Sequence, residues 1–309
     1  MKNAVYVIVG LFIVSILVYV YFYHVIPAQA DEPELNLIKT DNHNLGKTYS
    51  VVLPDNLSFC SEPVPLNDQD VRERLDRELL INTYWQSQTL LIIKEFNKIK
   101  PIVEPILKEY GIPEDFIYLA AAESGYRNLV SPSKAAGIWQ FLEETGKSYG
   151  LEINNEVDER YHFEKSTIAA CKYIQKSYQK FGNWTMAAAS YNMGLTGLDE
   201  VSFSQKQTNY YDLHLNTETS RYVFRILALK EILRSPSKYG FMISETDLYK
   251  PHAFKSISID TAIASLTDFA ALYKMTYKEL KILNPWLRSN MLTNKSTKSY
   301  QLKIIPDKQ

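Results

Sequence analysis

Residues 112–126 read Ile-Pro-Glu-Asp-Phe-Ile-Tyr-Leu-Ala-Ala-Ala-Glu-Ser-Gly-Tyr. This stretch has the pattern of a short helix with a marked beginning and end. Pro113 suits a first helical turn, and the two acidic residues after it interact favourably with the positive end of the helix dipole. Gly125 suits the position just past a last turn. We therefore predict a short helix that ends near Glu123.

Glu123 lies on the apolar face of this predicted helix. Counting back from it by helical steps reaches Ala120, Leu119 and Phe116. Burial disfavours an ionised carboxylate and can raise the pKa of a glutamate from about 4.3 toward roughly 6 or 7. Such a glutamate can donate a proton at neutral pH. An arginine-paired or solvent-exposed glutamate at a helix end is the alternative, because Glu-Ser-Gly alone is a weak motif.

Two further motifs follow: Gly-Ile-Trp-Gln-Phe at residues 137–141 and Ala-Ser-Tyr-Asn-Met-Gly at residues 189–194. Together with Glu-Ser-Gly at 123–125, they resemble in order and interval the lytic transglycosylases of the soluble-lytic-transglycosylase, or goose-lysozyme-like, superfamily. The resemblance covers roughly residues 66–233 and is closest to the membrane-bound lytic murein transglycosylase D group. It implies a mainly α-helical protein with a lysozyme-like catalytic domain, which we place at residues 67–240.

The resemblance also implies a reaction. Glycoside cleavage generally uses two carboxylates, yet no second motif carboxylate is present, and we expect Glu143 and Glu144 to be exposed. In the family a single glutamate acts twice. Glu123 would protonate the oxygen between N-acetylmuramic acid and N-acetylglucosamine, and would then take a proton from the C6 hydroxyl as a 1,6-anhydro ring closes.

The substrate-binding residues are likewise implied by the resemblance. Ser124 would steady the N-acetyl group and Gln140 would lie in the cleft. Tyr191 would form a hydrogen bond with the acid, Asn192 would hold a sugar, and Tyr222 would be a cleft tyrosine. From the residues alone, each of the first four fits equally a helix cap or a satisfied buried polar group, and Tyr222 fits the core.

The amino-terminal region, residues 1–30, is predicted to be an export segment. An apolar run from Ala4 to Val25 has about the length of one membrane span and ends in aromatic residues. We expect a retained transmembrane anchor, although Ala28-Gln29-Ala30 resembles a signal cleavage site. The protein would then lie in a bacterial cell envelope, on the periplasmic side. Residues 31–66 are interpreted as a proline-containing linker with one extended run at 49–53.

Composition excludes some classes of protein. The chain has 34 basic and 35 acidic residues, a net charge of −1, so it has no electrostatic field to gather nucleic acid. Metal-ligand and phosphate-loop spacings are missing from the sequence, so we expect neither a metal nor another cofactor. A disulfide between Cys60 and Cys171 is permitted but not required, and Cys171 suits a buried thiol.

Helical periodicity fills the rest of the catalytic region. We expect one helix near residues 71–96, a separate helix that begins at Pro101, another at 167–181, one capped by Asn183, and one at 218–233. Trp85 is expected to pack among these helices, and the alternative is that it lines a groove.

Residues 252–309 have a different pattern. Alternating residues at 255–259 and 300–306 predict two strands, with helical runs at 266–273 and 276–283 between them. This βααβ order resembles a LysM peptidoglycan-binding module, although the Gly-Asp-Thr-Leu start of that family is missing. We therefore predict a small α+β domain after the helical one.

Three functions compete. The first is a lytic transglycosylase that cleaves peptidoglycan glycan strands. The second is a hydrolase on the same fold, a goose-type muramidase, which would leave reducing ends. The third is a non-catalytic cell-wall-binding protein that kept the groove and the terminal module.

Overall fold

The computed structural model of this chain describes residues 48–306. The proposed anchor at 1–30 and the start of the linker lie outside the described residues. Within residues 48–306, no helix combines the length and the apolar character that a membrane crossing requires.

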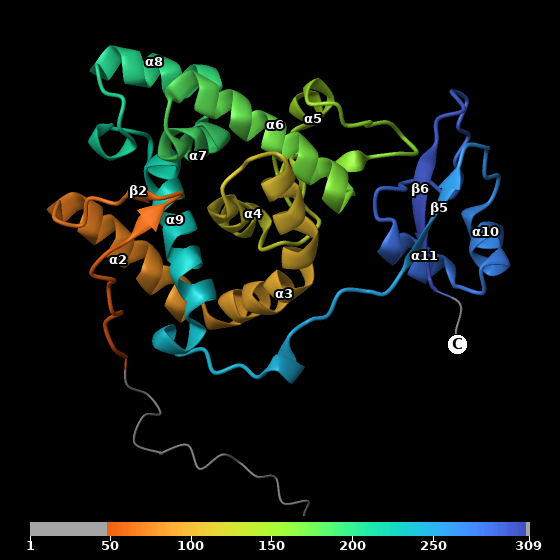
Figure 1. Cartoon of the computed structure of the whole chain (residues 1–309), viewed down its shortest axis with the longest axis horizontal. Coiled ribbons are helices and arrows are strands. Elements are labelled where there is room, and N and C mark those ends of the chain that lie inside the picture. Colours follow the sequence, from red (N-terminus) through yellow and green to blue (C-terminus); the bar gives the residue numbers. More distant parts are fainter. Residues whose placement is uncertain (1–47, 307–309) are drawn as a thin grey trace, which may run out of the picture. The chain divides into compact units, whose positions relative to one another are not determined.

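The described chain is mainly helical, as predicted (Figure 1). The region expected to be one helix near residues 71–96 is instead divided between two helices that meet at Trp85. The helices of the catalytic region are α2 Gln69–Tyr84, α3 Gln86–Glu109, α4 Ile117–Ser124, α5 Glu143–Ser148, α6 Phe163–Phe181, α7 Trp184–Met193, α8 Leu195–Gln205 and α9 Thr217–Arg234. Short 3-10 turns lie at η2 Glu114–Phe116, η3 Glu159–Tyr161, η4 Tyr210–Asp212, η5 Pro236–Tyr239 and η6 Glu245–Asp247.

Helix α4 forms where the sequence predicts it. The turn η2 leads into it, and the helix ends at Gly125, which adopts the left-handed conformation with φ +59°. The N–H of Gly125 donates to the carbonyl oxygen of Ala121 and closes the last turn. Because Leu119 and Ala120 are fully buried, α4 is held against α3 and α9, and its carboxyl end is fixed in place.

The helix predicted to begin at Pro101 is instead the second half of α3. Pro101 and Pro105 both lie inside this helix. A proline interrupts one backbone hydrogen bond of a helix, at a cost of about 3 kcal/mol. Here one buried apolar face continues past both prolines through Ile99, Val103 and Leu107, and its burial offsets that cost.

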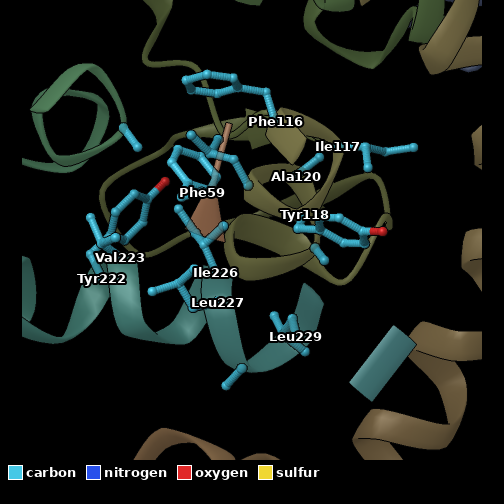
Figure 2. Close-up of a cluster of buried hydrophobic side chains, with 14 of the residues drawn as sticks. Phe59, Phe116, Ile117, Tyr118, Ala120, Tyr222, Val223, Ile226, Leu227 and Leu229 are labelled. Atoms are coloured by element: carbon cyan, nitrogen blue, oxygen red, sulfur yellow. The ribbon is translucent and has the colours of Figure 1, made fainter. Parts of the chain in front are cut away.

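The end of the predicted linker belongs to the core of the catalytic domain. Strands β1 Ser58–Phe59 and β2 Glu62–Pro63 pair antiparallel, and Phe59 contacts Phe116 with ring centroids 5.2 Å apart. Figure 2 shows Phe59 among side chains of α4 and α9. The tether interpretation is therefore wrong for these residues, because their apolar side chains bury area in the core. The extended run at 49–53 forms no strand.

A hairpin and a loop meet beside α4. Strands β3 Leu129–Val130 and β4 Ala136–Gly137 pair antiparallel. Arg160 forms an ion pair with Asp158 at 2.7 Å and donates to the carbonyl oxygen of Phe141. Gly137 has φ +84°, and a Cβ there would lie 1.9 Å from the carbonyl oxygen of Arg160. Only glycine permits this contact.

The terminal domain has the predicted βααβ order. Its elements are β5 Lys255–Ile259, α10 Leu266–Leu272, α11 Tyr277–Leu283 and β6 Tyr300–Ile304, and the two strands pair antiparallel. Main-chain hydrogen bonds connect it to the catalytic domain. The N–H of Asp158 donates to Trp286 at 2.9 Å, and that of Arg288 donates to Glu156 at 2.7 Å.

Both cysteines carry free thiols. Cys171 is fully buried in α6, in agreement with the prediction of a buried thiol, and Cys60 is half-buried beside β1. Burial raises the pKa of the Cys171 thiol to about 12, so it stays protonated and behaves as a small apolar group.

Candidate active site

Glu123 occupies the last turn of α4, and its carboxylate meets a hydroxyl from α9. The side chain is half-buried. The hydroxyl of Tyr222, a fully buried residue, donates a hydrogen bond to Oε1 of Glu123. The two residues are 99 positions apart in the sequence, so their contact depends on the packing of α9 against α4. The sequence predicted only that Tyr222 lies in the cleft, and the structure places its hydroxyl directly on the acid.

The environment raises the pKa of Glu123 from its ordinary value of 4.5 to about 7. Burial is the main cause, because it disfavours the charged form. The hydrogen bond from Tyr222 and the charge of Arg225 oppose the rise, and the charge of Glu218 adds to it. Near neutral pH the group therefore exists in both forms and can act either as an acid or as a base.

We predict that Tyr222→Phe will raise the pKa of Glu123 further, because the lost hydrogen bond stabilises the carboxylate. If cleavage needs the protonated acid, the alkaline limb of the kcat/KM profile will move to higher pH. Glycan-strand cleavage measured across pH 5 to 9 checks this. Tyr173→Phe is the matched control, since Tyr173 also lines the cleft but its hydroxyl donates to the carbonyl oxygen of Ser190. An alkaline limb that moves to lower pH would show that the hydroxyl does not stabilise the carboxylate.

Glu123 opens into a polar cleft of about 690 Å³. The predicted residues Gln140, Tyr191, Asn192 and Tyr222 all line this cleft. Most of the other lining residues are small, hydroxyl-bearing or aromatic. The full set of other lining residues is Ala122, Ser131, Ser133, Ala135, Phe141, Leu142, Thr145, Tyr173, Met193, Gly194, Leu195, Glu218 and Arg225.

Tyr191 lies at the cleft, but it does not form the expected hydrogen bond with the acid. Its hydroxyl donates to the carbonyl oxygen of Trp139 at 2.8 Å, and Tyr222 occupies the position beside Glu123. Burial, and then the charge of nearby Glu123, raise the pKa of Tyr191 well above its usual range. Tyr191 therefore connects the Gly-Ile-Trp-Gln segment to α7, and the hydrogen bond expected between Tyr191 and the acid is not formed.

Gln140 and Asn192 face the cleft from two different elements. Gln140 has φ +49°, and its amide nitrogen donates to the carbonyl oxygen of Gly137 at 2.7 Å. Asn192, near the end of α7, accepts a hydrogen bond from Thr219 at 2.8 Å. Among the described residues, the amide nitrogen of Asn192 has no hydrogen-bond acceptor. Asn192 thus offers a donor to a ligand in the cleft.

Ser124 is buried and its hydroxyl has hydrogen-bond partners within the protein. Its hydroxyl lies 2.8 Å from the carbonyl oxygen of Ile138 and 3.2 Å from that of Ala120. It does not line the main cleft, although it lines a smaller compartment beside it. The hydroxyl therefore connects α4 to the 137–141 segment, which fits the alternative of a satisfied buried polar group, and the expected contact with an N-acetyl group stays a prediction.

Two charged residues of the cleft were not predicted. Glu218 and Arg225 lie on α9, one near its start and one two turns later, and form an ion pair at 3.2 Å. Their sequence pattern is that of an ordinary solvated helix face, so only the position of α9 identifies them. Glu143 and Glu144 are exposed, as predicted, and Glu143 pairs with Lys147. Within residues 48–306, no cluster of three or more metal-ligating side chains occurs.

The described chain thus holds a half-buried glutamate at the end of a short helix, with a tyrosine hydroxyl bound to it, beside a polar cleft in a mainly helical domain. Comparison with known protein families identifies two domains. Residues 102–213 match the transglycosylase SLT domain, and residues 255–309 match the soluble lytic transglycosylase C-terminal LysM-like domain. The chain therefore contains an SLT domain followed by a LysM-like domain, which confirms the family resemblance read from the motifs.

Two curated relatives extend the match. Both are described as membrane-bound lytic murein transglycosylase D, one from Escherichia coli strain K12 and one from Escherichia coli O6:H1 strain CFT073. Each is 29% identical over 238 residues, which cover 74% of this chain and 50% of the relative. The chain thus spans about half the length of the curated relatives it matches.

Proposed function

We propose that this protein is a peptidoglycan lytic transglycosylase that cleaves the β-1,4 bond between N-acetylmuramic acid and N-acetylglucosamine. The observation that carries the proposal is a single half-buried carboxyl, Glu123, with a pKa raised to about 7 in a polar cleft. The SLT domain and the two relatives support the choice of substrate.

In the first step, protonated Glu123 donates its proton to the bridging oxygen. The bond from this oxygen to C1 of the muramoyl sugar then breaks, and N-acetylglucosamine leaves with a free 4-hydroxyl. Positive charge develops at C1 and the ring oxygen. Glu123 is now a carboxylate, and the Tyr222 hydroxyl and the charge of Arg225 stabilise it in that form.

In the second step, the same carboxylate removes the proton of the C6 hydroxyl of the muramoyl sugar. The freed oxygen bonds to C1, and a 1,6-anhydro ring closes. Glu123 regains its proton, so the enzyme returns to its starting state and no water is consumed. One group with a pKa near neutrality meets the needs of both steps.

Hydrolysis is the alternative on the same fold, and Glu218 is the observation that keeps it open. This second carboxylate lines the cleft, although its side chain is 58% exposed and paired with Arg225. A hydrolase would need it, or a water it activates, on the opposite face of the sugar. Glu218→Gln should therefore abolish a hydrolase but leave most of the activity of a transglycosylase.

Mass spectrometry of digested sacculi tests the proposal. A transglycosylase releases muropeptides with 1,6-anhydro ends, each lighter by one water than the hydrolytic product. Reducing ends would instead identify a hydrolase. Intact strands that bind the protein but release no product would identify a wall-binding protein.

We also propose that residues 1–30 anchor the protein on the periplasmic side of a bacterial envelope. The apolar run from Ala4 to Val25 and the membrane-bound description of both relatives support this. Fractionation of cells that express the chain with and without residues 1–30 tests it. Membrane recovery of both forms would count against an anchor in this segment.

A further inference from the structure

A second compartment of about 370 Å³ lies beside the main cleft. The two share Ala122, Glu123 and Arg225 in their linings, so the acid lies where they meet. The second compartment is formed by the junction of α2 with α3, the end of α4 and the exposed side of α9. A substrate that reaches Glu123 can therefore extend to either side of it.

The two compartments differ in charge. The second is lined by the guanidinium groups of Arg127, Arg221 and Arg225. While Glu123 carries its proton, only Glu78 opposes them, which leaves two formal positive charges. In the main cleft, Arg225 faces Glu218, which leaves no formal charge when Glu123 is protonated. The second compartment therefore favours an anion, whereas the main cleft on the other side of the acid does not.

Most guanidinium donors of this compartment have no acceptor among residues 48–306. The guanidinium group of Arg127 donates within the described part of the chain only to the side chain of Gln88, at 3.4 Å. Arg221 donates through Nε to Glu78, at 2.6 Å. An arginine carries several N–H donors in a planar fork that matches a carboxylate. The remaining donors at this partly exposed site are available to a ligand.

Glu78 shows that the compartment is built and not a chance gathering of surface charge. It is 1% exposed, and its Oε2 atom has no hydrogen-bond partner among the described residues. Burial of a carboxylate is costly unless its charge is paired. Glu78 holds Arg221 and lies 4.0 Å from Nε of Arg225, so it fixes the direction of both side chains.

Trp85 completes the compartment. Its side chain was expected in the core, but it is 61% exposed and lines the second compartment between α2 and α3. An exposed tryptophan offers a rigid, flat apolar surface beside the charged groups. The site therefore combines an anion-binding fork with a face against which part of a sugar or peptide can pack.

We propose that this second compartment binds a carboxylate of the substituent carried by the muramoyl sugar. The proposal rests on the proposed function. Two groups of the substrate have this chemistry: the lactyl carboxylate, which is free once the peptide has been removed, and the carboxylates of the peptide itself. Charge-assisted bonds to a guanidinium are about twice as strong as neutral ones, so the compartment sets the register of the strand across Glu123.

The test measures binding without cleavage. In the Glu123→Gln chain, we would compare Arg127→Gln with Arg77→Gln, an exposed arginine of α2 that lines neither compartment. The probes are soluble uncrosslinked strands of three kinds. One bears peptides, one has been stripped by an amidase so that lactyl carboxylates are free, and one is stripped with those carboxylates converted to methyl amides.

We expect Arg127→Gln to weaken binding of carboxylate-bearing strands by about tenfold, the size of one charge-assisted interaction. Arg127→Lys, which keeps the charge but loses the fork, should lose less. A loss confined to peptide-bearing strands identifies the peptide carboxylate, and a loss shared with stripped strands identifies the lactyl group. An equal loss on all three probes, no loss on any, or an equal loss in Arg77→Gln would overturn the proposal. Anhydro products from wild type test the lytic activity separately.

Discussion

Replacing Glu123 with glutamine is expected to lower the rate of glycan cleavage by about a thousandfold or more, because general acid and general base steps each contribute roughly 10²–10⁴-fold. The amide keeps the shape of the protonated acid but can neither give up nor accept the proton. Release of soluble muropeptides from purified sacculi measures the effect. Glu144→Gln, at an exposed position of α5, is the control and should keep wild-type activity.

The same variant should be more stable than wild type in alkaline solution. The folded pKa of Glu123 is raised from 4.5 to about 7, so the folded state holds its proton more tightly than the unfolded state does. Stability from this group is present below pH 4.5 and is lost as the pH rises to about 7. Glutamine cannot ionise, so the variant avoids this loss. Its free energy of unfolding should exceed that of wild type by up to about 3 kcal/mol at pH 8 and by almost nothing at pH 4. An inactive variant that is also less stable at pH 8 would point to misfolding instead.

The second large effect is expected at Gly137. Gly137→Ala should destabilise the catalytic domain by more than about 3 kcal/mol, because left-handed backbone costs an L-residue roughly 1–2 kcal/mol and the rest comes from the displaced main chain. The added Cβ would lie 1.9 Å from the carbonyl oxygen of Arg160, which cannot move without disturbing the ion pair with Asp158. Chemical denaturation followed by circular dichroism measures the loss.

Gly182 supplies the comparison for this substitution. It also has a positive φ, +74°, but a Cβ there meets nothing within 4 Å. Gly182→Ala should therefore cost only about 1 kcal/mol of backbone strain. The two variants should also differ in activity. Gly137→Ala should lose more of it, since Gln140 follows Gly137 by three residues and lines the cleft. If the two alanine variants lose equal stability, the close contact at Gly137 does not matter.

Local chemistry explains why so much of the fold could be predicted. Pro113 and Gly125 mark the beginning and end of the η2–α4 segment through their own backbone preferences, and the apolar spacing of α4 places Glu123 toward the interior. The βααβ order of the terminal domain follows from an equally local change of period. Pro101 misled the prediction, because a proline that starts a helix and one that a buried face tolerates look alike in sequence.

The errors in the site have a different origin. Which tyrosine reaches the acid depends on how α9 packs on α4, and no pattern within either helix contains that information. Tyr191 and Tyr222 therefore exchanged roles between expectation and structure. The positions of Arg225 and Trp85 could not be predicted for the same reason. Each lines the second compartment only because elements distant in sequence meet there. The identity of the acid could be predicted from the motifs, whereas its hydrogen-bond partner could not.

The ionisation of Glu123 is the most direct test of the central claim that one shielded carboxyl serves as both acid and base. Carbon-13 NMR of glutamate-labelled protein, with the Glu123→Gln spectrum used to assign the signal, follows that carboxyl through a pH titration. We predict a midpoint of about 7. A midpoint near 4.5, the ordinary value, would mean that the group is a solvated carboxylate at neutral pH and that the proposed double role is wrong.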